Sequence, residues 1–370
     1  MVGGQEGCHD ARVPVRHDVV TRRALLRGTL GTAAALAGGG IIAACAPQAG
    51  PGGGASPGAS LPPPETTTVR FVSPAACDPP TAIAKEFLLE EGFTDIQYVS
   101  VPVTTTEWLT ANKADFHSGY GNLIAANIDA GLPMLALAGI HPGCFELFAA
   151  PGISGIRDLR GKTVAVNAKN ASDQFFGFFS ILLAYLGIDP LTEVNFIEIK
   201  PDVAALRDAF LDGRSQAFIA PAAFGPDLRR NPKNPGEVIL DTTMDKPWSQ
   251  YYCCQLVVNR DWARRYPIAT KRVTRAVLRA CDAVKKDRAY AAREYVARFV
   301  AAPRPNEVEI VSEVIRDLSY DWRELDPEET LRFFALRLAD AKLVKMTSQQ
   351  IIAQGSDFAY MRQLRTELKQ

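Results

Sequence analysis

The sequence predicts an α/β protein in which two doubly wound sheets form two lobes joined by two hinge strands. Short β-prone runs alternate with helical runs in two consecutive blocks, the first from residue 68 and the second after Pro151. This alternation is typical of mostly parallel sheets flanked by helices. Two short, extended and apolar segments, residues 144–151 and 251–259, connect the blocks, and from Pro267 onward the pattern is mostly helical.

The composition argues against several classes of protein. Among 370 residues, 41 Lys and Arg balance 41 Asp and Glu, so the formal net charge is zero. A nucleic-acid-binding protein normally carries a basic excess, and we expect no nucleic-acid partner. Apolar residues make up 47% and charged residues 22% of the chain, as in ordinary globular proteins. The body contains no uninterrupted apolar run of about 18 residues, which argues against a polytopic membrane protein.

Residues 1–45 have the features of an export signal, in the expected order. Residues 21–27 contain a twin-arginine pattern, a mildly apolar Ala, Gly and Leu segment follows, and small residues 42–44 directly precede Cys45. These features predict a twin-arginine lipoprotein signal peptide in which Cys45 is lipidated and becomes the mature N-terminus. The alternative is a short buried helix that happens to carry two arginines.

Residues 46–67 are expected to form a spacer. The segment is almost entirely Gly, Pro, Ser and Ala, and such a chain has little apolar surface to bury and stays extended. A lipid anchor, a tether and a globular body predict an extracytoplasmic protein held at a membrane, either in a periplasm or on the outer face of the cytoplasmic membrane.

The first block has a clear helix and a clear stop. Ile83, Phe87 and Leu88 recur at helical spacing, and Gly92 ends the run. The predicted elements, in order, are strand 68–73, helix 79–91, strand 96–101, helix 108–111, a glycine-rich turn at 117–121, helix 122–130 and strand 134–139.

The second block repeats the alternation. Phe175, Phe176, Phe179 and Leu183 form the inward face of a long helix. The predicted elements, in order, are a turn at 158–162, strand 163–166, helix 172–186, strand 194–199, helix 203–211 and strands 217–220 and 238–240.

Two helix starts are marked in the C-terminal region. Asp326 followed by Pro327 fits an N-cap with proline at the first helical position. Thr347 and Gln350 have the spacing of a capping box.

The blocks predict the lobes and the place of a ligand. Residues 68–147 together with 256–370 are assigned to lobe 1, and residues 148–255 to lobe 2. Ligands of open α/β sheets bind beyond the carboxyl ends of the strands, so we expect a site in the cleft between the lobes. Ligand contacts to both lobes would favour a closed form over an open one.

Several segments between residues 68 and 365 resemble a known family. The sequence is similar to the periplasmic solute-binding proteins of ABC importers, with their type II fold. Within that class it resembles the nitrate, sulfonate, taurine and thiamine-pyrimidine branch (SsuA/THI5-like). The segments that carry the resemblance are AGLP at 130–133, GISGIRDLRGKTVAV at 152–166, PWSQYYCC at 247–254 and YPIATKRVTRA at 266–276.

The resemblance implies that the protein binds and delivers a solute and catalyses no reaction. The protein would capture a small organic solute outside the cytoplasm and deliver it to an ABC permease with its ATPase. No covalent step and no cofactor is implied, so an enzyme is not expected.

Candidate ligand contacts in lobe 1 follow two strands. The loop after the first strand carries Ser73, Cys77 and Asp78, just before a helix. Asp78 fits a helix N-cap, which is the plainer reading; as a ligand contact, its carboxylate would repel a bare anion and favour an amine. The other candidates, Ser118, Gly119 and Tyr120, would let a ligand approach the backbone, or would simply form a strand-to-helix turn.

Candidate contacts in lobe 2 lie at a helix start and at the return hinge. Asn167 and Ser172 precede the long helix, whose N-terminus favours a polar or negative ligand group, although capping by Asn170 or Ser172 is the alternative. Trp248 and Tyr251 could stack on a flat ring or wrap a cation, and hinge packing is the alternative. Together with Asp78 they favour an aminated or zwitterionic solute, a thiamine-type aminopyrimidine first and a taurine-like aminosulfonate second.

The cysteines and histidines predict no metal site. A disulfide from Cys144 to Cys253 or Cys254 is possible in an oxidising compartment, but buried free thiols are the preferred interpretation. Beyond Cys45 the chain keeps only His117 and His141 and has no H-E-x-x-H or paired C-x-x-C motif. A zinc site is therefore not expected.

Two alternatives from other classes stay open. One is a pyrimidine-biosynthetic enzyme of the THI5-like type, which carries a Cys-Cys-Cys-Phe-Gly run. Here Cys253 and Cys254 are followed by Gln255, so that motif is incomplete. The other is an extracytoplasmic sensor subunit, because a fold alone does not fix function.

Overall fold

The computed structural model describes residues 61–101, 106–199 and 202–368. The described residues all belong to one compact unit, Ala55–Gln370, and all that follows concerns this unit. The predicted signal peptide with Cys45 and the spacer up to residue 60 lie outside the described residues. The two lobes lie within one unit, so their boundaries stay a prediction.

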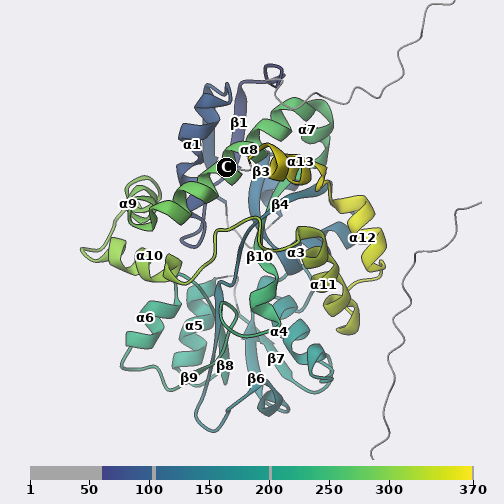
Figure 1. Ribbon diagram of the computed structural model, residues 1–370. Coiled ribbons are helices and arrows are strands. Elements are labelled where there is room, and N and C mark those ends of the chain that lie inside the picture. Colours follow the sequence, from purple (N-terminus) through teal and green to yellow (C-terminus); the bar gives the residue numbers. More distant parts are fainter. Residues whose placement is uncertain (1–60, 102–105, 200–201, 369–370) are drawn as a thin grey trace, which may run out of the picture. The chain divides into compact units, whose positions relative to one another are not determined.

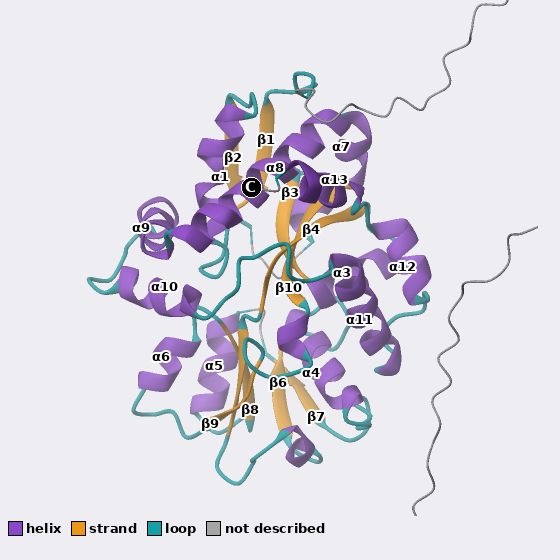
Figure 2. Cartoon of the chain, viewed as in Figure 1, coloured by secondary structure: helices purple, strands orange, loops and turns teal. Residues whose placement is uncertain are grey.

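The first sheet, sheet A, has five strands in the order β2-β1-β3-β10-β4 (Figures 1 and 2). Strand β1 runs parallel to β2 and β3, whereas β10 runs antiparallel to both β3 and β4. The chain re-enters this sheet from the opposite end at β10, which is why β10 runs against its neighbours β3 and β4. The strands are β1 (Thr68–Val72), β2 (Asp95–Val99), β3 (Phe116–Tyr120), β4 (Met134–Pro142) and β10 (Tyr252–Asn259).

Helices from both ends of the described chain surround sheet A. Helix α1 packs on α8 and α9, while α3 contacts β3, β4, β10 and α11. The helices are α1 (Pro79–Glu90), α2 (Glu107–Thr110), α3 (Gly121–Asp129), α7 (Arg260–Arg265), α8 (Pro267–Lys286), α9 (Arg288–Phe299), α10 (Glu307–Arg316), α11 (Pro327–Asp340), α12 (Ser348–Gly355) and α13 (Ala359–Glu367).

The second block forms two small sheets. Sheet B has the order β8-β5-β9, with β5 antiparallel to both neighbours, and sheet C is the parallel pair β6 and β7. A backbone hydrogen bond connects sheets B and C: the backbone N–H of Gln216 donates to the Thr163 carbonyl oxygen over 2.8 Å. The elements are β5 (Phe145–Ala149), β6 (Thr163–Val166), α4 (Gln174–Tyr185), β7 (Asn195–Glu198), α5 (Val203–Leu211), β8 (Ala217–Pro221), α6 (Gly225–Arg230), β9 (Glu237–Asp241) and 3₁₀ turns at Ile156–Leu159 and Trp248–Gln250.

Most predicted elements are confirmed within a few residues, but two expectations are wrong. The segment 117–121 is not a turn, because most of it lies in β3, where β1 and β10 on either side supply backbone hydrogen bonds. The strands are also not mostly parallel. The two segments that connect the blocks, residues 144–151 and 251–259, are called here the first and second crossing, and they contain β5 and β10. Each of these two strands runs antiparallel to its neighbours.

Aspartates cap the helices that position the site. The Asp78 Oδ1 accepts from the Thr81 amide at the start of α1, and Asp326 caps α11 as expected. Helix α4 is capped by Asp173, which accepts from the Phe176 amide over 2.8 Å. Ser172 is therefore not the cap that the sequence suggested as an alternative.

The end of the predicted spacer is held against the body. The Arg272 guanidinium donates to the carbonyl oxygens of Leu61 and Pro62, at 2.6 and 2.8 Å from Nη2. The Glu65 carboxylate accepts from the amides of Ile268 and Ala269 in the first turn of α8, where a negative charge is favourable. Residues 61–65 therefore contact the body, while the spacer as a whole stays a prediction.

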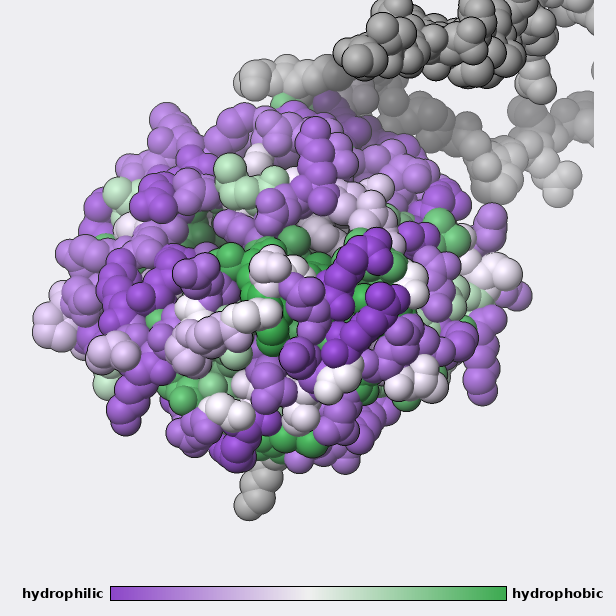
Figure 3. Space-filling view, turned by 90° about the horizontal axis from the view of Figure 1, so that it is seen from below, coloured by the Kyte–Doolittle hydropathy of each residue, from purple (hydrophilic) through white to green (hydrophobic). Residues whose placement is uncertain are grey.

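The face at the β6–β9 end of the molecule is largely hydrophilic. Seen from this end, apolar side chains gather in patches among hydrophilic ones (Figure 3). Among the described residues, no helix combines the length and hydropathy that crossing a membrane requires.

Candidate functional site

A narrow cleft lies at the carboxyl ends of β1 and β3, beside β10. Five of the ten residues predicted to contact a ligand line it: Ser73, Cys77, Asp78, Ser118 and Tyr120. His117 and Cys254 complete the chemically active part of the lining. This is the edge at which open α/β sheets bind their ligands.

The cleft is small and contains polar atoms that lack partners. Its free volume is about 10 Å³, enough for roughly one water molecule. Asp78 Oδ2 and Ser118 Oγ are buried and make no hydrogen bond. Buried polar atoms usually have partners, because an unmade hydrogen bond costs about 1–3 kcal/mol. The cleft thus offers two polar groups to an incoming ligand.

Asp78 differs electrostatically from a surface aspartate. The residue is 1% exposed, and this burial raises the pKa of Asp78 to about 7, against the opposing hydrogen bond from Thr81. A carboxyl group with this pKa is partly protonated near neutral pH. It can therefore accept from an amine when charged and donate a proton when neutral, so the sequence argument that it repels a bare anion is weakened.

The other predicted contacts do not line this cleft. Gly119 lies within β3, where a Cβ would meet Ile124 and Val257. Trp248 is 6% exposed and packs edge-on against Phe333, while Tyr251 stacks on Phe333 with ring centroids 3.9 Å apart. Both rings therefore pack on α11, and contact of either with a ligand stays a prediction.

The two polar candidates of the second block lie near the start of α4. Asn167 Nδ2 donates to the Ile199 carbonyl oxygen at 3.5 Å, and the Ser172 amide donates to Asn170 Oδ1 at 3.0 Å. Neither lines the cleft at Asp78. The helix start itself approaches α3, because Gln174 Nε2 donates to Asn122 Oδ1 over 3.4 Å.

Three thiols and one imidazole meet at the base of the cleft. Cys77, His141, Cys144 and Cys254 are all buried, and one ligand atom of each lies within 4.8 Å of all the others. The Cys144 and Cys254 sulfurs are 3.9 Å apart, far beyond the ~2.05 Å of a disulfide. The five described cysteines are free and buried, in line with the preferred expectation.

The pKa values of two thiols in this group, Cys144 and Cys254, shift in opposite directions. Burial raises the pKa of the Cys144 thiol well above its usual range. Burial also acts to raise the pKa of Cys254, but the hydrogen bonds from Cys144 and Cys77 and the charge of His141 together outweigh it and lower that pKa. Cys254 is therefore the thiol that loses its proton more readily.

Each member of the group is fixed by a different element. Tyr320 Oη donates to the Cys77 carbonyl oxygen over 2.8 Å, and Cys254 pairs with His141 between β10 and β4. Cys144 follows Gly143 in the first crossing, and its amide donates to Thr242 Oγ1 over 3.2 Å. Sequence motifs could not reveal this group, because Cys144 and Cys254 lie 110 positions apart.

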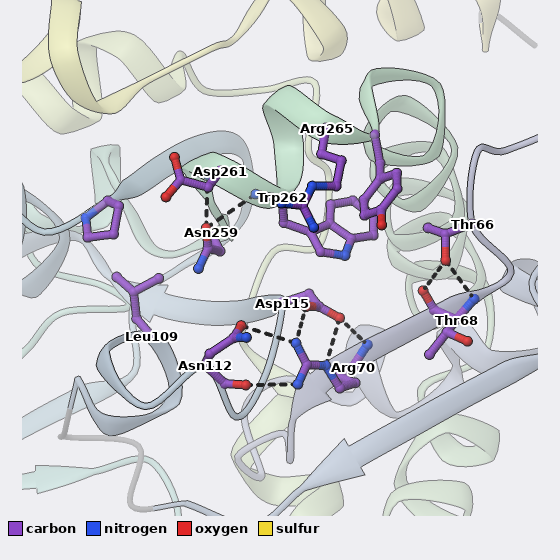
Figure 4. A pocket seen from close by; sticks show the side chains of 12 residues that line it. Thr66, Thr68, Arg70, Leu109, Asn112, Asp115, Asn259, Asp261, Trp262 and Arg265 are labelled. Carbon is purple, nitrogen blue, oxygen red and sulfur yellow. Dashed lines mark hydrogen bonds and ion pairs between the residues drawn. The ribbon is translucent and has the colours of Figure 1, made fainter.

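A second, wider depression of about 500 Å³ lies at the other end of β1 (Figure 4). Two of its charged groups, Arg70 and Asp115, already pair with each other. Arg70 Nη2 forms an ion pair with Asp115 at 2.6 Å, and Arg70 Nη1 donates to the Asn112 carbonyl oxygen over 2.8 Å. The residues that line this depression lie at the amino end of β1. Because open α/β sheets bind ligands at the carboxyl ends of their strands, the cleft at Asp78 is the better candidate site.

The comparisons with known proteins agree with the fold. The family model described as NMT1/THI5 like matches residues 81–291. Among curated proteins, none matches the chain. Several of the similar solved structures are named as solute-binding proteins, at identities that show a shared fold.

Three of these structures illustrate the likeness. The alkanesulfonate-binding protein SsuA from Xanthomonas axonopodis pv. citri bound to MOPS has a TM-score of 0.61 at 16% identity, covering 81% of this chain and 100% of that chain. The periplasmic nitrate-binding protein NrtA from Synechocystis PCC 6803 has a TM-score of 0.62 at 15% identity, covering 83% and 90%. The zinc-bound ligand-binding component of an ABC-type import system from Staphylococcus aureus has a TM-score of 0.61 at 12% identity, covering 80% and 97%.

These likenesses confirm the expected α/β fold of periplasmic binding proteins. The family model spans more than half of the 370 residues, and the chain therefore belongs to the NMT1/THI5-like family.

Proposed function

We propose that this protein is the solute-binding component of an ABC import system and binds its solute without altering it. The observation that carries the proposal is the cleft at the carboxyl ends of β1 and β3, where Asp78 Oδ2 and Ser118 Oγ are buried without partners. Family membership and the named functions of proteins with the same fold support it.

The proposed solute is a small aminated or zwitterionic molecule. An amine placed between Asp78 Oδ2 and Ser118 Oγ would satisfy both atoms, and a thiamine-type aminopyrimidine or a taurine-like aminosulfonate carries such a group. Because the cleft has room for roughly one water molecule, an organic solute must enter a more open form. Opening and closing about the two crossings, near β5 and β10, is the movement we propose.

Contacts between the two sheet regions would set the balance between open and closed forms. Glu313 on α10 forms ion pairs with Arg229 and Arg230 at α6. Lys342, just after α11, pairs with Asp189 at 2.7 Å. Exposed pairs of this kind contribute little each, about 0–1 kcal/mol, which leaves the balance open to bias by a ligand.

A ligand screen with a matched variant tests the solute class. The screen first identifies an aminated solute that stabilises the wild type in a thermal-shift assay. Asp78→Asn keeps an oxygen that can cap α1 but removes the carboxylate. We therefore expect this variant to bind the same solute at least tenfold more weakly than the wild type does. Asp326→Asn changes an N-cap far from the cleft and should bind like the wild type. Stabilisation by nitrate alone would contradict the proposed class.

The same material distinguishes the alternatives. Native mass spectrometry of the full chain, purified without refolding, should recover a bound solute whose mass is unchanged after incubation. A guest that emerges chemically altered would favour a pyrimidine-biosynthetic enzyme. Normal uptake of the bound solute in cells that lack the chain would favour a sensor subunit.

We also propose that Cys45 carries a lipid and that the protein works outside the cytoplasm. Cys45→Ser should move the exported protein from the membrane fraction to the soluble fraction, because the lipid is its only proposed attachment. Cys8→Ser, a cysteine upstream of the proposed cleavage site, should leave the distribution unchanged. A Cys45→Ser protein that remains in washed membranes would overturn this assignment.

A further inference from the structure

We infer that Cys77, His141, Cys144 and Cys254 form a binding site for one thiophilic metal ion of the zinc class. Three sulfurs and one imidazole nitrogen are a donor set that suits tetrahedral Zn²⁺. All four side chains are buried and their ligand atoms lie within 4.8 Å of one another. The inference rests on the proposed function only for the role of the ion, not for its binding.

The distances fit a metal site better than the alternatives. Two sulfurs bound to one tetrahedral zinc at about 2.3 Å lie about 3.8 Å apart, and the Cys144 and Cys254 sulfurs are separated by 3.9 Å. The widest separation in the group exceeds that value by only about 1 Å. A disulfide between Cys144 and Cys254 would instead require the two sulfurs to approach by nearly 2 Å, since its bond length is about 2.05 Å.

The imidazole is oriented as a metal ligand. His141 is fully buried, and its Nδ1 lies 3.0 Å from the Pro142 carbonyl oxygen, an acceptor that fixes the proton on Nδ1. This leaves a lone pair on Nε2, which has no hydrogen-bond partner. A metal-bound histidine usually donates from one ring nitrogen to an acceptor such as a backbone carbonyl and binds the metal through the other nitrogen.

The backbone at Cys144 supports the same conclusion. Its φ of +141° lies in a region that residues other than glycine rarely adopt. Strain of this kind is kept where the surroundings over-determine it, often at functional sites. Here Gly143 and the hydrogen bonds to Thr242 hold the crossing in the shape that brings the Cys144 sulfur to Cys254.

The position of the ion would give it a role in the cleft. Cys77 and Cys254 belong both to the group and to the lining of the cleft at Asp78. Cys144 lies in the first crossing and Cys254 in the second, so one ion would tie the two crossings together at the base of the site. The bound metal would therefore shape the floor on which the solute rests and restrict the hinge.

Cobalt and zinc titrations of the full chain, freed of metal and reduced, test the site. We expect one Co²⁺ per chain, with a thiolate-to-cobalt charge-transfer band and intense visible bands typical of tetrahedral cobalt, and displacement by Zn²⁺. Cys144→Ser and Cys254→Ser should each weaken zinc binding at least tenfold and lower the charge-transfer band by about a third, because two thiolates of three remain. Cys281→Ser removes a buried cysteine on α8 outside the group and should match the wild type.

A second measurement keeps the test valid if the variants unfold. In the wild-type chain, zinc should slow alkylation of Cys77, Cys144 and Cys254 at least tenfold, with no effect on Cys281. Absence of a charge-transfer band, unchanged binding in both ligand variants, or recovery of a Cys144–Cys254 disulfide from the freshly purified chain would overturn the site. Solute binding by metal-free protein would still support the proposed function, so the two hypotheses fail separately.

Discussion

Tyr252→Ala is expected to lower the free energy of unfolding by about 4 kcal/mol, in the range for truncating a buried aromatic residue. Tyr252 is fully buried in β10, and its hydroxyl donates to the Trp322 carbonyl oxygen over 2.8 Å. Its ring occupies the space that Gly139 leaves open on β4, where any Cβ would overlap the ring. Truncation would therefore leave a cavity between the second crossing and its neighbour strand, together with an unpaired carbonyl group.

Tyr252→Phe is the matched control for this prediction. It keeps the ring and removes only the hydroxyl, so we expect a loss of about 1–2 kcal/mol from the missing hydrogen bond. Urea-induced unfolding followed by circular dichroism gives both values. Equal losses in the two variants would show that the hydrogen bond, and not the packing of the ring against Gly139, stabilises this part of the sheet.

Gly143→Ala should cost about 3 kcal/mol and should also disturb the base of the cleft. Gly143 has a φ of +71°, which costs an L-residue about 1–2 kcal/mol. A Cβ there would lie 2.5 Å from Thr243 Oγ1 and 2.8 Å from its Cα. Because the Cα belongs to the backbone, a side-chain rotation cannot relieve the overlap, and the crossing that carries Cys144 must move.

Gly152→Ala separates the two contributions. Gly152 also has a positive φ, +86°, but a Cβ there would meet nothing within 4 Å. We expect it to cost about 1 kcal/mol from backbone strain alone. Denaturant unfolding of both variants gives the difference, and a Gly143→Ala loss no larger than that of Gly152→Ala would contradict the tight contact at the first crossing.

Local patterns in the sequence were enough to predict most elements of the fold. The apolar spacing in α1, the Asp326 cap of α11 and the capping box at Thr347 each depend on residues within one or two turns. Such signals survive without knowledge of the tertiary structure. The loop before α1 could be singled out for the same reason, since Ser73 and Asp78 follow a predicted strand directly.

Other features depended on neighbours that are distant in the sequence. The run around Gly119 has the composition of a turn, and only the flanking strands β1 and β10 make it part of a sheet. In the sequence, Tyr251 and Trp248 have the appearance of ligand-stacking residues. Only the tertiary structure shows that Phe333 on α11 packs against both rings. Propensity is a weak guide wherever tertiary contacts supply the hydrogen bonds or the packing.

By itself the sequence determined the α/β alternation, the two crossings and the loop that carries Asp78, because these follow from the periodicity and punctuation of adjacent residues. Only the tertiary structure decided that Cys77, His141, Cys144 and Cys254 meet at one point. The physical reason is that β10 returns to sheet A between β3 and β4, and a pairing of strands so far apart in the chain leaves no local pattern from which their contact could be inferred.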